Sequence, residues 1–156
     1  SSTSRGLGDV YKRQVGQRQS GAYGMVLPRF VASAIKGEPI TVYGDGSQSR
    51  VFCHVSDAVD GILRIFFNDR ALGEAFNIGG EEEVTIGELA NRVIKVTSSN
   101  SKVVFVPYKE AYPPGFEETM RRVPDTTKLR NFTGWKPQFS LDAIIKDIEN
   151  YLRANS

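Results

Sequence analysis

The residues best suited to bind a ligand lie in the stretch EPITVYGDGSQSRVFCHVSD, residues 38–57. A short apolar strand there runs into a glycine-aspartate turn at residues 44–46, which accepts positive φ angles. Tyr43 and Arg50 lie on the two shoulders of this turn. An aromatic ring can stack on a planar base, and the forked donors of a guanidinium can bind a phosphate or a base carbonyl. The spacing indicates a nucleotide site, although a polar hairpin with a surface arginine fits it equally well.

The apolar pattern around this stretch predicts an α/β protein with dominant helices and short strands in pairs. Strands are expected over residues 40–43, 51–54, 75–78 and 103–106. The first expected helix covers residues 25–36 and ends in a left-handed residue at Gly37. Three further helices are expected to follow N-caps, which are Ser56 or Asp57, then Thr85 in a capping box with Glu88, and finally Ser140. A short helix is expected from Asp125 or Thr126 to Phe132. Residues 108–119 are expected to form a long polar loop, which favours a functional role.

Composition excludes several classes of protein. The chain has 156 residues, of which 40% are apolar and 24% charged, as expected for one globular domain. A net charge of +2 with scattered Lys and Arg argues against nucleic-acid binding, and no apolar run indicates a membrane span or a signal peptide. A cytoplasmic location is therefore expected.

The lone cysteine and the lone histidine favour structural roles. Cys53 lies in an apolar run and is expected to be a buried, reduced thiol. His54 has no Cys, His or Asp cluster around it at metal-ligand spacing, so neither a metal site nor a Ser-His-acid set is indicated.

Three motifs carry a resemblance to a known family. The run PRFVASAIKGEPITVYGDGSQSRVFCHVSDAVDGI is followed by FNIGG and by RRVPDTTKLRNFTGWKP. Residues 15–156 thereby resemble the C-terminal half of the nucleotide-sugar epimerase/dehydratase family. These are extended short-chain dehydrogenases, and they include UDP-glucose 4-epimerases and UDP-glucuronate decarboxylases. The resemblance implies the substrate-binding part of a Rossmann-like enzyme that uses NAD and acts as a homodimer.

Two features of that family have no counterpart here. No Tyr is followed four positions later by Lys, and the Gly6-Leu7-Gly8 pair follows SSTSR rather than an apolar strand. A glycine-rich loop without its strand and helix cannot cradle a pyrophosphate. We therefore expect the NAD-binding half to be absent, with no catalytic residue and no cofactor in this chain alone. Residues 1–14 are expected to be a non-native or disordered leader.

The resemblance implies six substrate-binding residues: two at the base, two at the diphosphate, one at the ribose and one through its main chain. In that order they are Thr41 and Tyr43, Arg50 and Arg122, Glu118, and Val26. Arg121 is expected to face solvent. An acidic turn without a ligand remains an equal alternative for Glu118.

Two functions remain open. The first is the UDP-sugar-binding portion of an NAD-dependent epimerase, dehydratase or decarboxylase, inactive by itself. The second is a stand-alone nucleotide-sugar-binding or regulatory module without catalysis. In either case, strands meant for a neighbouring sheet would leave edges and apolar faces uncovered, so association of the isolated chain is expected.

Overall fold

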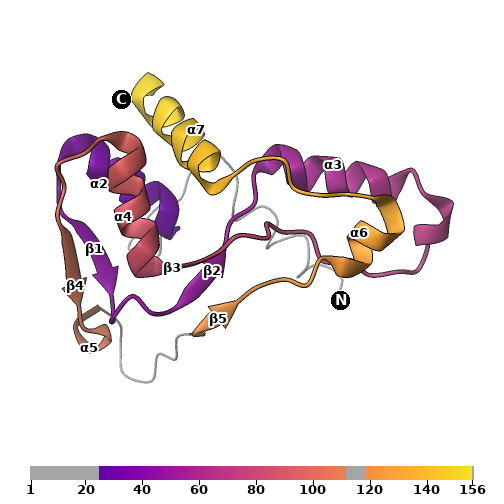
Figure 1. The fold of residues 1–156 in the computed structure, drawn as a ribbon, viewed down its shortest axis with the longest axis horizontal. Coiled ribbons are helices and arrows are strands. Elements are labelled where there is room, and N and C mark those ends of the chain that lie inside the picture. Colours follow the sequence, from indigo (N-terminus) through magenta and orange to yellow (C-terminus); the bar gives the residue numbers. More distant parts are fainter. Residues whose placement is uncertain (1–24, 112–118, 156) are drawn as a thin grey trace.

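The computed structural model describes residues 25–111 and 119–155. Its elements, in chain order, are α2 (Val26–Lys36), β1 (Ile40–Tyr43), β2 (Ser49–Val51), α3 (Val55–Phe66), η1 (Asp69–Ala71), β3 (Glu83–Thr85), α4 (Ile86–Thr97), β4 (Val103–Val106), α5 (Tyr108–Ala111), β5 (Arg121–Arg122), α6 (Thr127–Thr133) and α7 (Leu141–Ala154). Figure 1 shows α2, α4, β1 and β4 at one end, α3 and α6 at the other, and β2, β3 and β5 between them.

Two small sheets divide the strands. β1 pairs in parallel with β4, with Ile40 opposite Val103 and Tyr43 opposite Val106. β2 pairs antiparallel with β3 and parallel with β5. The consecutive strands β1 and β2 therefore lie in different sheets and form no hairpin. The turn between them carries the chain from one sheet to the other.

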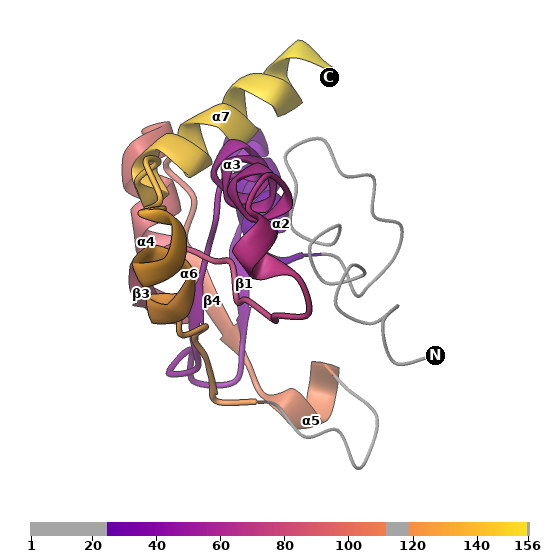
Figure 2. The ribbon, with the colours of Figure 1, turned by 90° about the vertical axis from the view of Figure 1, so that its right-hand side faces the viewer.

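The main hydrophobic core lies between three helices and β1. Figure 2 shows α7 crossing the end of the molecule where α2 lies. The central side chains of this core come from α2, β1, α4 and α7. They are Leu27, Phe30, Val31, Ala34, Ile40, Val42, Leu89, Ala90, Val93, Ile144, Ile145 and Ile148. Ile40 and Val42 alternate with the half-buried Thr41 and Tyr43, so one face of β1 packs on the core and the other does not.

Several helix ends follow the sequence prediction. Gly37 ends α2 in the left-handed region, at φ 70°. Thr85 and Glu88 form the predicted capping box at the start of α4, and the Ser140 hydroxyl accepts the main-chain N–H of Ala143 at the start of α7. These helices are thus fixed by local hydrogen bonds as well as by burial.

The start of α3 differs from the prediction. The second strand is Ser49–Val51 rather than residues 51–54, and neither Ser56 nor Asp57 caps the helix. His54 does so, because its Nδ1 accepts the main-chain N–H of Ser56 at 3.1 Å. This bond makes Nε2 the protonated ring nitrogen, which lies 3.0 Å from an Asp147 carboxylate oxygen. Buried in this way, His54 has a structural role.

Cys53, next to His54, also differs from the sequence prediction. Cys53 is half-buried rather than buried, and its thiol lies 3.5 Å from the His54 carbonyl oxygen. The predicted polar loop begins instead with the short helix α5, and residues 112–118 lie outside the described residues.

Asp57 has a different role from the predicted cap. Its buried carboxylate accepts the main-chain N–H groups of Gln138 and Phe139, at 2.9 and 3.1 Å. The indole N–H of the fully buried Trp135 donates to the Asp57 carbonyl at 2.9 Å. Asp57 therefore joins α3 to the segment that leads into α7.

The predicted strand at residues 75–78 is wrong, because the structure gives this segment no regular secondary structure. The apolar side of α3 nearby is also largely uncovered. Its exposed apolar residues, with those that follow the helix, are Val59, Ile62, Leu63, Phe66, Phe67 and Leu72. The fractions reach 77% for Phe66 and 80% for Phe67. A strand at residues 75–78 would need a neighbouring strand for its main-chain hydrogen bonds, and the described part of the chain supplies none.

Candidate functional site

The two arginines predicted to bind phosphate lie opposite each other. Arg50 on β2 is the register partner of Arg122 on β5 in the parallel pair of strands (Figure 1). Partners on neighbouring strands project from the same face of a sheet, and like charges at such positions repel. An anion bound between them would remove this repulsion. The structure thus brings together two residues that are far apart in the sequence.

The contacts of these guanidinium groups lie close to β5. Arg50 donates from Nη1 to the carbonyl oxygen of Ser49 at 2.6 Å and to that of Met120 at 3.4 Å. Arg122 donates from Nη2 to the Thr119 hydroxyl at 3.3 Å, and its side chain is exposed. The donors of the two side chains therefore converge on the segment that enters β5.

The neighbouring Arg121 has a carboxylate partner of its own. It donates from Nε and Nη2 to the two oxygens of Glu83, both at 2.9 Å. Ser49 donates to the same carboxylate at 2.5 Å. The hydrogen bonds from Arg121 and Ser49 lower the pKa of Glu83, and the bond to Glu83 raises the pKa of Arg121. Arg121 is 67% exposed, in agreement with the prediction, but its pairing with Glu83 was missed because it joins different strands.

The two residues predicted to contact the base share a third neighbour. Thr41 and Tyr43 lie on the half-buried face of β1. The guanidinium of Arg29, from α2, lies 4.5 Å from the centre of the Tyr43 ring and donates to the Thr41 carbonyl oxygen at 3.1 Å. Sequence reasoning missed Arg29, although an arginine among the apolar residues of α2 was a visible signal.

The turn between Tyr43 and Arg50 is fixed by its own contacts. Gly44 and Gly46 both have φ of 75°, as the glycine-aspartate pattern predicted. A side chain on Gly44 would overlap the Tyr108 ring. The buried Gln48 donates to the Tyr43 carbonyl at 3.0 Å. The turn therefore holds Tyr43 at a defined position relative to β2.

The Asp45 carboxylate closes the exposed tip of this turn. It accepts the hydroxyl and the main-chain N–H of Ser47, at 2.6 and 2.9 Å. These two bonds lower the pKa of Asp45. Asp45 is thus engaged in shaping the turn.

The remaining predicted residues are less informative. Val26 is half-buried at the first position of α2 and packs against the main core. Met25 precedes it as the N-cap and makes no side-chain capping bond. Glu118 lies outside the described residues, so the structure does not place it.

Two surface hollows lie elsewhere. One, of about 300 Å³, is lined by residues that include Phe52, Gly80 and Gln138. The other, of about 520 Å³, lies beside Phe67 and Phe132. Neither is lined by a residue predicted to bind substrate. Across residues 25–111 and 119–155, no group of His, Cys, Asp and Glu side chains could hold a metal ion, and no helix is long and apolar enough to cross a membrane.

Comparison with known proteins gives the family. The profile of the GDP-mannose 4,6 dehydratase family matches residues 8–148. A UDP-N-acetyl-alpha-D-glucosaminuronate decarboxylase from Bacillus cytotoxicus is 40% identical over 135 residues, which cover 86% of this chain and 42% of that enzyme. UDP-glucuronic acid decarboxylase 4 from Arabidopsis thaliana is 39% identical over 118 residues, covering 76% of this chain and 25% of that enzyme. The chain thus spans less than half the length of either relative.

Solved structures agree with the sequence comparison. A UDP-glucose 4-epimerase from Thermotoga maritima, solved with UDP-glucose, superposes with a TM-score of 0.73 at 27% identity, covering 86% of this chain and 42% of that one. An epimerase from Methanothermobacter thermautotrophicus gives a TM-score of 0.75 at 26% identity, covering 85% of this chain and 38% of that one. The expected α/β, Rossmann-like fold is confirmed. The chain belongs to the GDP-mannose 4,6 dehydratase family, within the NAD-dependent nucleotide-sugar epimerases, dehydratases and decarboxylases.

Proposed function

We propose that this chain is the UDP-sugar-binding portion of an NAD-dependent nucleotide-sugar epimerase, dehydratase or decarboxylase, and that it is inactive alone. The opposed pair Arg50 and Arg122 carries the proposal. Two forked donor groups on one sheet face suit the two phosphates of a nucleoside diphosphate. Relatives and neighbours named for UDP-sugars support uridine as the nucleoside.

The other predicted residues complete this assignment. Tyr43 would stack on the uracil, with Thr41 beside it. Glu118 would bind the ribose hydroxyls, and the main chain at Val26 would contact the ligand. Binding energy at this end of the substrate would hold the sugar at the reacting centre, which lies in the other half of the enzyme.

NAD belongs to that other half in our proposal. A Thermus thermophilus UDP-glucose 4-epimerase, similar in fold, was solved with NAD. The glycine turn at residues 44–46 leads from β1 to β2 and not into a helix, so it offers no helix N-terminus to a pyrophosphate. This turn therefore does not fit the pyrophosphate of NAD, and no redox step is assigned to the described residues. We propose that the intact enzyme is a cytoplasmic homodimer.

A second candidate is a nucleotide-sugar-binding module that senses its ligand without catalysis. The opposed pair Arg50 and Arg122 would serve ligand binding in this case as well. Both candidates require ligand binding. Turnover on adding the NAD-binding half of a relative would select the first, and binding without turnover would select the second.

The test is calorimetric titration of the chain with UDP, comparing Arg122→Ala with Arg121→Ala. The two variants remove the same charge from adjacent residues, but Arg121 is paired with Glu83. Loss of a charge-assisted contact costs about 1.5 to 3 kcal/mol, so Arg122→Ala should weaken UDP binding by roughly 10- to 150-fold. Arg121→Ala should change it by less than about threefold. Equal loss in both variants, or no saturable binding by the unsubstituted chain, would contradict the proposal.

A further inference from the structure

We propose that Arg29 is a positioning residue for the base end of this site, because it fixes the Tyr43 ring on which the base stacks. The proposal rests on the proposed function. It assigns the selectivity for a base, as distinct from the attraction for phosphate, to a side chain on α2.

Arg29 contacts both residues assigned to the base. Its Nη2 donates to the Thr41 carbonyl oxygen at 3.1 Å, and its guanidinium carbon lies 4.5 Å from the centre of the Tyr43 ring. It also lies 5.5 Å from the Phe30 ring. A guanidinium within about 6 Å of an aromatic centre is attracted to the face of the ring. One side chain therefore ties the main chain of β1 and the Tyr43 ring to α2.

Hydrogen bonding alone does not explain the position of Arg29, because one of its donors has no partner among the described residues. Its Nε is buried and has no hydrogen-bond partner among residues 25–111 and 119–155. A buried donor without a partner is unfavourable, and such groups in native structures call for a reason. The contacts with Thr41 and Tyr43 hold the guanidinium in this position despite that cost.

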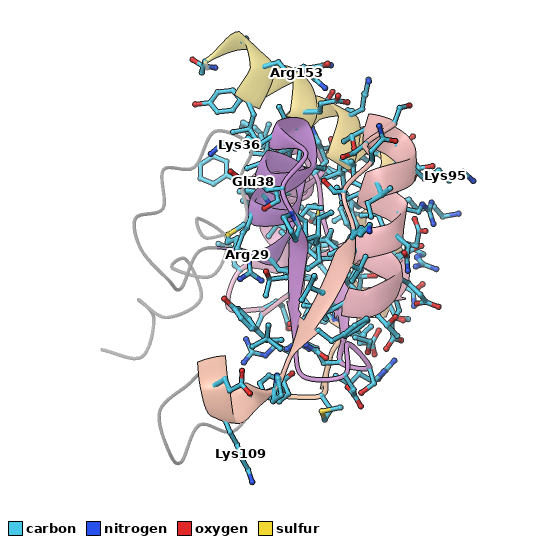
Figure 3. All side chains as sticks on the ribbon, turned by 90° about the vertical axis from the view of Figure 1, so that its left-hand side faces the viewer. Arg29, Lys36, Glu38, Lys95, Lys109 and Arg153 are labelled. Carbon is cyan, nitrogen blue, oxygen red and sulfur yellow. The ribbon has the colours of Figure 1, made fainter. Side chains whose placement is uncertain are left out.

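Contacts on two sides hold Tyr43 in place. Gln48 holds the Tyr43 carbonyl at 3.0 Å, while Arg29 acts on the ring. The ring plane is thus set relative to the turn that leads to Arg50. In Figure 3, Arg29 and Lys95 of α4 lie on opposite sides of the molecule.

The test compares UDP with inorganic pyrophosphate as calorimetric ligands of the whole chain. Arg29→Met keeps an unbranched apolar stem and removes the guanidinium. It should weaken UDP binding by roughly 3- to 10-fold, through loss of the cation–π contact, and leave pyrophosphate binding unchanged. Lys36→Met, at the other end of α2, removes a charge from the same helix and should leave both ligands unaffected. Thermal melts of each variant verify the fold.

A double-variant cycle separates positioning from direct contact. In a Tyr43→Leu background, Arg29→Met should have no further effect on UDP binding, because the ring through which Arg29 acts is gone. An undiminished effect in that background would overturn the proposal, as would equal weakening of pyrophosphate. Tighter UDP binding in Arg29→Met would also overturn it, by showing that the guanidinium competes with the base. If UDP fails to bind the unsubstituted chain, the proposed function falls together with this inference; all the other outcomes leave the proposed function standing.

Discussion

The indole N–H of Trp135 donates to the main-chain carbonyl of Asp57, and the Asp57 carboxylate in turn accepts N–H groups from the segment that follows Trp135. Gly61, one turn along α3, lets the indole approach, since a Cβ there would lie 3.2 Å from the indole nitrogen. A buried carboxylate and a buried tryptophan thus join α3 to the start of α7.

Replacing Asp57 with Ala should destabilise the fold by about 2 to 4 kcal/mol, because two N–H groups lose their buried acceptor. The measurement is the free energy of unfolding in urea. Asp60→Ala is the control, since Asp60 pairs with Arg64 on the exposed side of the same helix. It should cost less than about 1 kcal/mol. Similar losses for the two variants would show that the Asp57 bonds contribute little.

Gly80 should tolerate no side chain. A Cβ at this position would lie 1.9 Å from the carbonyl oxygen of Phe52, so the main chain would have to move. We expect Gly80→Ala to cost about 2 to 4 kcal/mol by calorimetric melting. Gly87→Ala, in the first turn of α4, meets only ordinary contact distances and should be neutral or stabilising by up to about 1 kcal/mol. An unchanged melting temperature for Gly80→Ala would contradict the close approach.

The uncovered side of α3 should drive association of the chain. Replacing both Phe66 and Phe67 with Ser should weaken self-association by at least about tenfold, since each buried phenyl ring contributes about 1.5 to 3 kcal/mol. Sedimentation velocity over a range of concentrations measures this. Met120→Ser, which removes a 54% exposed apolar side chain near β5, is the control and should have little effect. A monodisperse unsubstituted monomer would refute the prediction.

Stability should fall in acid through Glu149. Burial raises the pKa of this carboxylate, but hydrogen bonds from Lys146 and Arg153, with their charges, outweigh burial and leave the pKa below its ordinary value. A lowered folded-state pKa stabilises the fold above the unfolded pKa, and this contribution disappears as pH falls through the folded value.

At pH 7 the free energy of unfolding of Glu149→Gln should therefore be about 1 to 2 kcal/mol below that of the unsubstituted chain. This difference should close in acid, as pH falls through the lowered folded-state pKa of Glu149. Urea unfolding at several pH values measures the difference. Glu38→Gln, on the exposed segment between α2 and β1, should show no such difference at either pH. A gap that persists in acid would assign the loss to packing and not to charge.

The helices of this fold were predictable because their signals are local. The apolar spacing of α2, the capping box of Thr85 and the Ser140 cap each lie within a few residues. Strand pairing depends on distant partners, and the sequence alone could not place β2 between β3 and β5. The cap at His54 was missed because it depends on which ring nitrogen is protonated, and Asp57 was misassigned because its partners lie near Trp135.

The candidate site was predictable in the same uneven way. Family motifs pointed to Arg50 and Arg122, and the strand register brings them together. The sequence marks Arg29 as an arginine in an apolar helix, but its contact with Tyr43 could not be predicted, because that contact depends on how α2 lies across β1.

The shortness of β5 has a kinetic consequence. Its two residues meet β2 across a separation of 70 positions between Arg50 and Met120, and closing so long a loop is entropically costly for so few main-chain hydrogen bonds. β5 should thus dock late in folding and detach often in the native state. The Ser49 amide, which donates to Met120 at 2.7 Å, would exchange its hydrogen with solvent early. An anionic ligand that bridges β2 and β5 would slow that exchange, because it would stabilise the docked position of β5.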